Sequence, residues 1–379
     1  MADLVADVVV IGAGPAGSAA AATCAAAGAR VVLADRKRFP RDKVCGDGLL
    51  PDAMTALAAL GLEERLRAEG APVTGIRFRA PGGREGFVPC GGRAIRRETL
   101  DALVRESAIG RGARPLDGAT LEGFGGAAPR WTSARFATAS GRVDVAARWF
   151  VLATGAAPQP RRLAGLGDLG RCGAAVRGYA DLDSLATDAL YVRFERRFPR
   201  GYFWAFPVGG SRWNLGCGVF DRSGAMLVSE LEAFAAGIGA RWLTRPKGAA
   251  LATAFPHLAV ARGNALAVGD AAGLTRPFSG EGIGPALVSG TLAARHLVDS
   301  DGDPARAYAR ALRSRYATEY RAWRLGERLL RLPRIVDLIV KRVESSRVAR
   351  ERIKAVLADR TPTRTVLSPL GLARILLGR

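Results

Sequence analysis

The fold is decided near the start of the chain, where residues 5–17 read VADVVVIGAGPAG. A β-branched apolar run leads into three glycines spaced Gly-x-Gly-x-x-Gly, and an Ala-rich segment that ends at Gly28 follows them. This order predicts a buried strand, a tight turn and a helix. Gly12 permits the turn, Gly14 lets the backbone approach a pyrophosphate, and Gly17 lets the helix pack closely on the strand. The stretch therefore indicates a dinucleotide-binding βαβ unit.

The residues after the first helix support this interpretation. A second strand, expected at residues 30–33, leads to Asp35, which lies 23 residues after Gly12. At this distance an acid can accept a hydrogen bond from a ribose hydroxyl. The pyrophosphate is expected at the N-terminus of the first helix, beside Pro15 and Ala16. The motif by itself does not distinguish a flavin dinucleotide from a nicotinamide dinucleotide.

The rest of the chain alternates between this domain and a second one. Buried-strand candidates at residues 148–152, which end at Ala153-Thr154-Gly155, and at residues 265–268 belong to the first domain. Between them, several strand-like runs and a helix near residues 226–239 indicate a separate sheet. We therefore expect an α/β protein with three parts: a Rossmann-like dinucleotide-binding domain of residues 1–72, 96–160 and 259–300, a second β-sheet substrate lobe of residues 73–95 and 161–258, and a helical carboxy-terminal segment of residues 301–379.

Composition narrows the class of protein. With 49% apolar and 24% charged residues, a chain of 379 residues is expected to be globular with a sizeable core. It has five cysteines without a Cys-x-x-Cys pair and only two histidines, so we expect no metal site and a reducing, cytoplasmic location. The apolar start lacks the basic region of a signal peptide, and no later stretch reaches the roughly 18 uninterrupted apolar residues of a membrane span.

The chain is strongly basic, with a formal net charge of +21 and 51 Arg against 5 Lys. Residues 301–379 hold 19 basic and 8 acidic residues, so the surplus is concentrated at the C-terminus. One helical face within residues 335–343 is apolar and comprises Val336, Ile339, Val340 and Val343. Such a helix can lie on an anionic bilayer at the inner face of the membrane, or it can pack on its own domain or a second subunit. Nucleic acid is not expected, because no recognised binding module accompanies the charge.

A second glycine-rich signal lies later in the chain. Residues 268–272 read VGDAA, and residues 280–284 read GEGIG ahead of a long helix. Together with residues 97–101, RETLD, they resemble the flavoprotein class that includes para-hydroxybenzoate hydroxylase. The resemblance implies that FAD is the bound cofactor, with Asp270 at its ribityl chain and Arg97 in contact with it. The helix after Gly284 would aim its N-terminus near the isoalloxazine and stabilise reduced flavin through its dipole. The residues expected to bind FAD are Gly12, Gly14, Pro15, Ala16, Gly17, Asp35, Arg36, Cys45, Gly46, Arg97, Gly155, Asp270, Gly280, Gly282 and Ile283.

Two further segments resemble the geranylgeranyl reductase family. Residues 43–48 read KVCGDG, similar to that family's Lys-Pro-Cys-Gly-like loop over the flavin, although Val44 stands where the family often has Pro. Residues 199–207 read PRGYFWAFP and match its Pro-x-x-Tyr-x-Trp-x-Phe-Pro motif, which lines the substrate cavity. The resemblance thus assigns Tyr202, Trp204 and Phe206 to substrate binding. By spacing alone they share one face of a strand, which suits either an apolar cavity or a plain core sheet.

The resemblance implies an enzyme that saturates C=C bonds of a prenyl lipid, a prenylated quinone or a polyene or enone natural product. Reduced FAD would supply the hydride, and Cys45 or Tyr202, or a water that they hold, would supply the proton. No second βαβ unit with a Gly-x-Gly-x-x-Gly turn is evident, so NAD(P)H must dock transiently, or a reduced redox protein must be the electron donor. The alternative is an FAD-dependent monooxygenase on the same scaffold. Halogenation is disfavoured because, of the two Trp in the Trp-x-Trp-x-Ile-Pro motif of halogenases, only the second is matched, and Phe206 stands at the Ile position. A carrier without activity is disfavoured because the glycines and Asp270 are intact.

Overall fold

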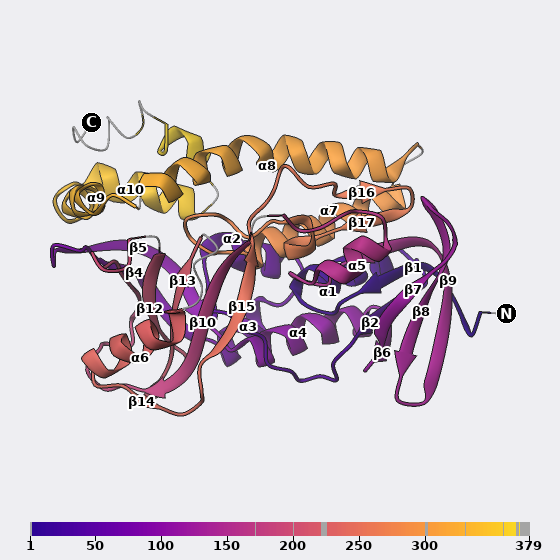
Figure 1. Ribbon diagram of the computed structural model, residues 1–379, viewed down its shortest axis with the longest axis horizontal. Helices are drawn as coiled ribbons and strands as arrows, with labels where there is room; N and C mark the ends of the chain where they lie inside the picture. The colour runs from indigo at the N-terminus through magenta and orange to yellow at the C-terminus, as the bar shows by residue number, and fades with distance from the viewer. Residues whose placement is uncertain are drawn as a thin grey trace.

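The structure is a computed structural model that describes residues 2–170, 172–199, 201–220, 226–299, 302–329, 331–358, 360–368 and 371. It contains two multi-stranded sheets, with helices packed on both and a group of helices at the C-terminal end (Figure 1). The expected mixed α/β fold is confirmed. Arg200, within the aromatic motif, lies outside the described residues.

The first sheet is built around β1 (Leu4–Ile11), which pairs in parallel with β2 (Val31–Asp35) and β9 (Gly141–Leu152). The sheet extends outward through β6 (Arg114–Asp117) on one side and β17 (Ala265–Ala267) and β16 (Ala261–Arg262) on the other. The strands β7 (Thr120–Ala127) and β8 (Arg130–Thr138) continue from β9 as an antiparallel meander. Val8 and Val10 are buried in one core cluster and Val9 and Ile11 in another, so both faces of β1 are covered, which explains the apolar run from Val8 to Ile11.

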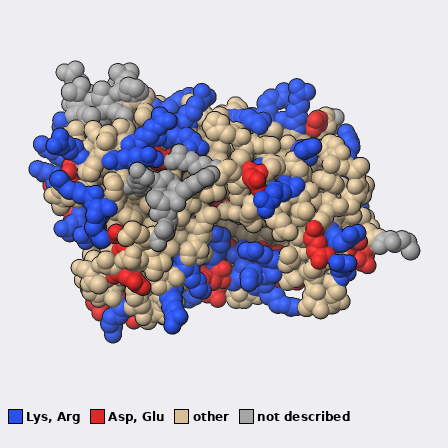
Figure 2. All heavy atoms as spheres, in the orientation of Figure 1, with Lys and Arg blue, Asp and Glu red and all other residues tan. Residues whose placement is uncertain are grey.

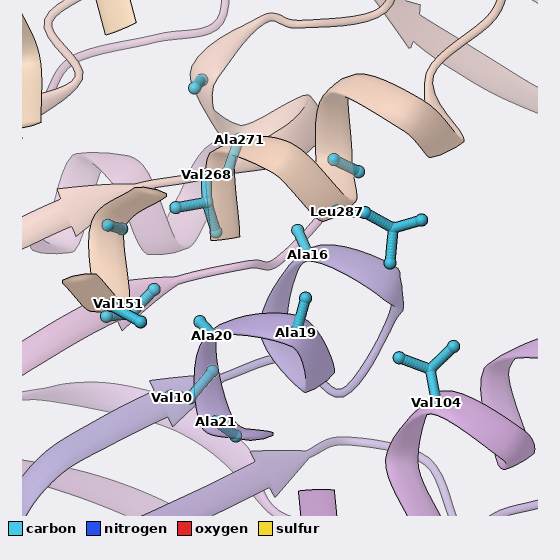
Figure 3. Close-up of a cluster of buried hydrophobic side chains, with 14 of the residues drawn as sticks. Val10, Ala16, Ala19, Ala20, Ala21, Val104, Val151, Val268, Ala271 and Leu287 are labelled. Atoms are coloured by element: carbon cyan, nitrogen blue, oxygen red, sulfur yellow. The ribbon is translucent and has the colours of Figure 1, made fainter. Parts of the chain in front are cut away.

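Small residues allow the helices on this sheet to pack closely. The helices are α1 (Pro15–Ala26), α4 (Arg97–Gly110) and α7 (Ile283–Asp299). Figure 3 shows Ala16, Ala19 and Ala20 of α1 in one cluster with Val10 and Val268 of the sheet. A Cβ at Gly290 of α7 would lie 2.0 Å from the Ala16 carbonyl oxygen, so α7 can cross α1 only because this residue is glycine. This close packing fixes where the N-termini of α1 and α7 lie relative to each other.

The second sheet has nine strands and draws on two separate parts of the chain. The order is β14-β10-β13-β12-β11-β4-β5-β3, with β15 paired to β10. Its bounds are β3 Gly48–Leu49, β4 Ala71–Arg79, β5 Glu85–Ala94, β10 Cys172–Asp181, β11 Ala189–Arg193, β12 Gly201–Pro207, β13 Arg212–Val219, β14 Arg241–Trp242 and β15 Lys247–Ala252. The helix α6 (Leu227–Gly237) covers one face, where Phe203 stacks on Phe234. The opposite face of β12, with Tyr202, Trp204 and Phe206, borders the cavity described below.

The remaining helices join or cover these sheets. They are α2 (Pro51–Ala58), α3 (Glu63–Glu69), α5 (Pro158–Leu163), η2 (Gly269–Ala272), α8 (Pro304–Leu329), α9 (Pro333–Ser345), α10 (Arg347–Leu357) and η3 (Thr363–Thr365). The Tyr308 hydroxyl of α8 donates to the Ala267 carbonyl oxygen at 2.7 Å and ties α8 to the first sheet.

The apolar face of α9 packs on the protein itself. Val336, Val340 and Val343 are buried, and α9 lies on β5. The backbone amide of Gly82, between β4 and β5, donates to the Asp337 carboxylate at 2.6 Å. Of the two interpretations of residues 335–343, packing on its own domain accounts for these three valines. Among the residues that the structure describes, no helix is both long enough and apolar enough to span a bilayer.

Candidate functional site

A cavity of about 470 Å³ runs from the glycine turn, past η2 and the start of α7, to the aromatic face of β12 and the C-terminal helices. All of the sequence-predicted site residues except Gly17 line it, namely Gly12, Gly14, Pro15, Ala16, Asp35, Arg36, Cys45, Gly46, Arg97, Gly155, Tyr202, Trp204, Phe206, Asp270, Gly280, Gly282 and Ile283. Gly17 lies behind the turn, where α1 packs on β1. The fold thus brings residues from both sheets to one continuous hollow.

The glycine turn has the geometry that a pyrophosphate requires. Gly12 has a φ of +105°, which favours glycine, and a Cβ there would lie 2.3 Å from the Ala153 carbonyl oxygen. The helix α1, all of whose residues are described, begins at Pro15, and it has no side-chain cap at Gly14 and no acid in its first turn. Its first N–H groups are therefore available to an anion. The Asp35 carboxylate accepts hydrogen bonds from Ala13 N and Lys37 N, both at 2.8 Å, and retains lone pairs for a ribose hydroxyl.

The middle of the cavity offers further polar groups. Asp270 accepts a hydrogen bond from the Thr275 hydroxyl at 2.9 Å, and its carboxylate borders the cavity. The buried hydroxyl oxygen of Thr154 also borders the cavity and has no hydrogen-bond partner among the described residues. A buried unpaired hydroxyl is costly unless a ligand or water satisfies it. These groups fit the polar ribityl and phosphate portions of a flavin dinucleotide.

Arg97 is held by an acid that the sequence analysis did not assign to the site. Its guanidinium forms a two-pronged ion pair with Asp101 at 2.7 and 2.8 Å, and Asp101 also accepts from Arg41 at 2.9 Å. Burial acts to lower the pKa of Arg97, but Asp101 and then Cys45 outweigh it and raise that pKa above its ordinary value. Arg97 therefore stays charged beside the Cys45 side chain. The i, i+4 spacing of Arg97 and Asp101 on a helix was the available sequence signal.

The Cys45 loop is fastened to the second sheet by a buried polar network. Asp47 is fully buried, and its carboxylate accepts from the Tyr179 hydroxyl and from the Asn214 amide, both at 2.7 Å. Asn214 also donates to the Cys45 carbonyl oxygen at 2.7 Å and accepts from the Trp204 indole N–H at 2.9 Å. One amide side chain thereby fixes the Cys45 loop and the Trp204 ring relative to each other.

The three aromatic residues of β12 face this loop and the cavity. A Cβ at Gly46 would lie 3.1 Å from the Phe206 ring and 3.4 Å from the Trp204 indole, so the loop passes close above both rings. The Tyr202 hydroxyl donates to the Ser279 carbonyl oxygen in the loop before α7. Burial raises the pKa of Tyr202 well above its ordinary value. Asp47, Tyr179 and Asn214 were not predicted as site residues, and only Asp47 carried a signal, through its place in the KVCGDG segment.

Replacement of Asp47 by Asn is expected to change how stability depends on pH. Burial raises the pKa of Asp47, although the hydrogen bonds from Tyr179 and Asn214 act in the opposite direction. A folded-state pKa above the unfolded value means that the native protein binds the extra proton. The group therefore favours folding at low pH, and this contribution is lost as the pH rises through the folded pKa.

The Asn variant has no carboxyl group to titrate at this position. Its free energy of unfolding should therefore rise relative to that of the wild type as the pH increases from about 4, the ordinary carboxyl pKa. Urea unfolding at several pH values up to neutrality measures the difference in free energy of unfolding. A difference that stays constant across this range would contradict the assignment.

The fold and the site together define an FAD-binding oxidoreductase. Residues 5–174 match a family model described as an FAD binding domain. The menaquinone reductase of Mycobacterium tuberculosis (strain ATCC 25618 / H37Rv) is 35% identical over 359 residues, with 87% of this chain and 85% of the relative covered. The chain belongs to the geranylgeranyl reductase family of FAD-dependent oxidoreductases, which confirms the resemblance seen in the sequence.

More distant proteins agree with this assignment. Digeranylgeranylglycerophospholipid reductase 2 of Methanopyrus kandleri is 27% identical over 332 residues, with 83% of each chain covered. A geranylgeranyl bacteriochlorophyll reductase-like protein from Thermoplasma acidophilum has a similar structure, with a TM-score of 0.84 at 20% identity, and 97% of this chain and 99% of that chain are covered. At this identity the structural match establishes the fold.

Proposed function

We propose that this flavoprotein saturates C=C bonds in the isoprenoid chain of a prenyl lipid, with a prenylated quinone as the foremost substrate. The observation that carries the proposal is the apolar arm of the cavity, which continues directly from the FAD-binding residues. Its walls include Ile76 and Phe78 of β4, Leu190 and Val192 of β11, the aromatic face of β12, Trp323 of α8 and Leu357 of α10, with Phe194 just after β11 and Phe278 in the loop before α7. Among the described residues, none that β4, β11, β12, α8 and α10 contribute to the cavity is charged. An arm of this kind suits an uncharged isoprenoid chain.

The choice of a quinone follows from the relative named menaquinone reductase, at 35% identity. When bound, reduced FAD supplies a hydride to one alkene carbon, and a proton must then reach the other carbon. Tyr202, Trp204 and Phe206 are proposed to hold the isoprene unit in place. Asp270, with the glycine turn and the start of α7, is proposed to hold the cofactor.

Cys45 is the proposed source of that proton. Its half-buried side chain lies on the cavity wall beside the Arg97 guanidinium, which would stabilise the thiolate left after proton transfer. Solvent would then return a proton to the thiolate. Tyr202 is the second candidate, but its hydroxyl would first have to give up its hydrogen bond to Ser279.

The reaction is tested by reducing the purified FAD-loaded protein with dithionite under anaerobic conditions and adding menaquinone in phospholipid vesicles. The expected result is reoxidation of the flavin without oxygen and a product heavier by two hydrogens per turnover. If the flavin stays reduced until oxygen is admitted and the product then gains oxygen, the protein is a monooxygenase and the proposal fails.

In the same assay, Cys45→Ala is expected to slow flavin reoxidation by about 10² or more, because a positioned general acid contributes about 10² to 10⁴. FAD should still bind, because the glycine turn, Asp35 and Asp270 are unaltered. Cys45→Ser should retain part of the rate, because a hydroxyl can hold a water at the same place. Reoxidation of the Ala variant at the wild-type rate would transfer the role to Tyr202, for which Tyr202→Phe is the matching variant.

NAD(P)H is the proposed electron donor and is expected to dock transiently. Arg36, Lys37 and Lys43 lie on the cavity wall at its dinucleotide end, where they can attract the donor's phosphates. Rapid mixing of the oxidised protein with NADPH or NADH, followed at the flavin absorbance, tests this. If neither nucleotide reduces the flavin, a reduced redox protein is the donor.

The C-terminal helices are proposed to rest on an anionic membrane surface at the cytoplasmic face. Figure 2 shows Lys and Arg side chains gathered on the part of the surface where Figure 1 places α9 and α10. Leu332 and Val348, which flank α9, are 52% and 46% exposed and can enter the headgroup region. The apolar arm of the cavity reaches the same helices through Trp323 and Leu357. A bilayer on this face would therefore lie close to the substrate arm.

Charge reversal of the exposed Arg334, Lys341 and Arg347 to Glu is expected to abolish sedimentation with anionic vesicles. Each basic residue near such a surface contributes about 1 kcal/mol, so the three together account for at least a hundredfold in binding. The matched control reverses the exposed Arg114, Arg130 and Arg148 of the first sheet and should still sediment. Equal loss in both triple variants would mean that only net charge matters, and no loss in either would refute membrane contact through these helices.

A further inference from the structure

Three charged side chains form a buried cluster at the N-terminus of α7, which borders the cavity. The Arg276 guanidinium lies 2.9 Å from the Asp52 carboxylate of α2 and 3.0 Å from the Glu281 carboxylate. All three side chains are less than 10% exposed. Burial acts to lower the pKa of Arg276, but Glu281 and Asp52 outweigh it and raise that pKa. One cation is therefore surrounded by two carboxylates away from water.

Both carboxylates are directed at the first turn of α7. One oxygen of Glu281 accepts a hydrogen bond from the Gly284 backbone amide at 2.8 Å. A Cβ at Gly284 would lie 2.5 Å from Asp52 Oδ2 and 3.0 Å from Glu281 Oε1. A glycine at this position is thus what allows two acids to approach the same turn of backbone.

The cluster lies where the cavity runs past the N-terminus of α7. Glu281, Gly282 and Ile283 all line the cavity, together with Cys45 and Tyr202. The N-terminus of a helix carries a partial positive charge that favours a nearby anion. Glu281 and Asp52 bring negative charge to this end of α7 and offset that effect. Two-electron reduction adds negative charge to a bound flavin, so its reduction potential depends on this balance.

We infer that Glu281 and Asp52 hold the reduction potential of the bound FAD low, so that the reduced cofactor is a strong hydride donor. The inference builds on the proposed function, because an isolated C=C bond is a poor hydride acceptor and calls for a strongly reducing donor. Arg276 positions the two carboxylates and reduces their mutual repulsion. Neither acid contacts the C=C bond in this scheme, and both act through the charge that they place beside the cofactor.

The test is the midpoint potential of the FAD-loaded protein, measured against redox dyes without any lipid. Glu281→Gln and Asp52→Asn each remove one negative charge and keep nearly the same shape, and the Gln oxygen can still accept from Gly284. Both variants are expected to shift the potential to more positive values. The matched control, Glu232→Gln on the exposed side of α6, should leave it unchanged. Gly284→Ala, which displaces both carboxylates without removing either, should also raise it.

Potentials of both acid variants equal to the wild type, with FAD bound, would overturn the inference. Loss of FAD from both would overturn it as well, because the acids would then hold the site together and not tune it. The potential is independent of substrate, so an unchanged value refutes the tuning even if prenyl lipids are reduced. A shifted value likewise stands even if those lipids prove not to be substrates.

Discussion

Gly17→Val is expected to weaken FAD binding strongly and to lower the stability of the first domain. A Cβ at residue 17 would lie 1.8 Å from the Gly12 carbonyl oxygen and 2.9 Å from the Ala153 Cβ. Neither neighbour can move without opening the glycine turn or separating α1 from β1. Overpacking of a well-filled core costs about 1 to 3 kcal/mol, and a clash with backbone lies at the upper end of that range. The N–H groups at the start of α1 would then no longer converge on a pyrophosphate.

The measurement is the ratio of flavin to protein absorbance after purification, together with the thermal unfolding midpoint. Binding should weaken at least about tenfold, which corresponds to about 1.4 kcal/mol. Gly110→Ala is the matched control, because a Cβ at this end of α4 meets no atom within 4 Å. It should retain FAD and unfold at the same or a higher temperature. A Gly17→Val protein with full flavin content would show that α1 is not seated on the strand as described.

Gly216→Ala is expected to disable the substrate arm while leaving FAD bound. A Cβ at Gly216 of β13 would lie 2.0 Å from Trp204 Cζ2. The indole cannot simply turn aside, because its Nε1–H is bonded to Asn214 and the same nitrogen lies close to the loop at Gly46. Displacement of Trp204 would break that hydrogen bond and free the Cys45 loop. We expect turnover to fall more than about tenfold and the free energy of unfolding to fall by about 2 to 4 kcal/mol, from overpacking and one lost buried hydrogen bond.

A double-mutant cycle with Trp204→Ala identifies the cause. Once the indole is absent, Gly216→Ala should lower the free energy of unfolding by less than about 0.5 kcal/mol, because the added Cβ then has no ring to clash with. Gly237→Ala on α6, where a Cβ meets no atom within 4 Å, controls for the loss of a glycine elsewhere in the same lobe. If Gly216→Ala costs the same with and without Trp204, the damage lies in the strand itself and Trp204 is not held as described.

The parts of the site that could be predicted are those encoded within a short stretch. The turn at Gly12 and Gly14, the acid Asp35 and the aromatic stripe of Tyr202 each depend on neighbours a few residues away or on one βαβ unit. The period-two spacing could not decide between a cavity wall and a plain core sheet. That choice depends on what faces the strand, and the structure places the cavity and the Cys45 loop there.

The connections between these stretches could not be predicted. Asp47 accepts hydrogen bonds from Tyr179, which is 132 residues away in the sequence, and from Asn214, which is 167 residues away. No local sequence pattern marks either partner. Arg276 and Asp52 likewise come from loops and helices far apart in the chain. The apolar face of α9 could have covered a bilayer, its own domain or a second subunit, and only the structure shows that Val336 and Val340 pack with Ala80 and Phe194.

By itself, the sequence determined the dinucleotide turn, the family and the α/β class, and it predicted the segments proposed to bind the flavin, because glycine geometry and apolar periodicity are local properties of the chain. The tertiary structure decided which polar groups meet in the interior: the network that joins Cys45 to Trp204, the ion pair that keeps Arg97 charged, and the acids gathered at α7. A buried charge or amide is stable only with a partner, and the partner is chosen by how the two sheets close on each other.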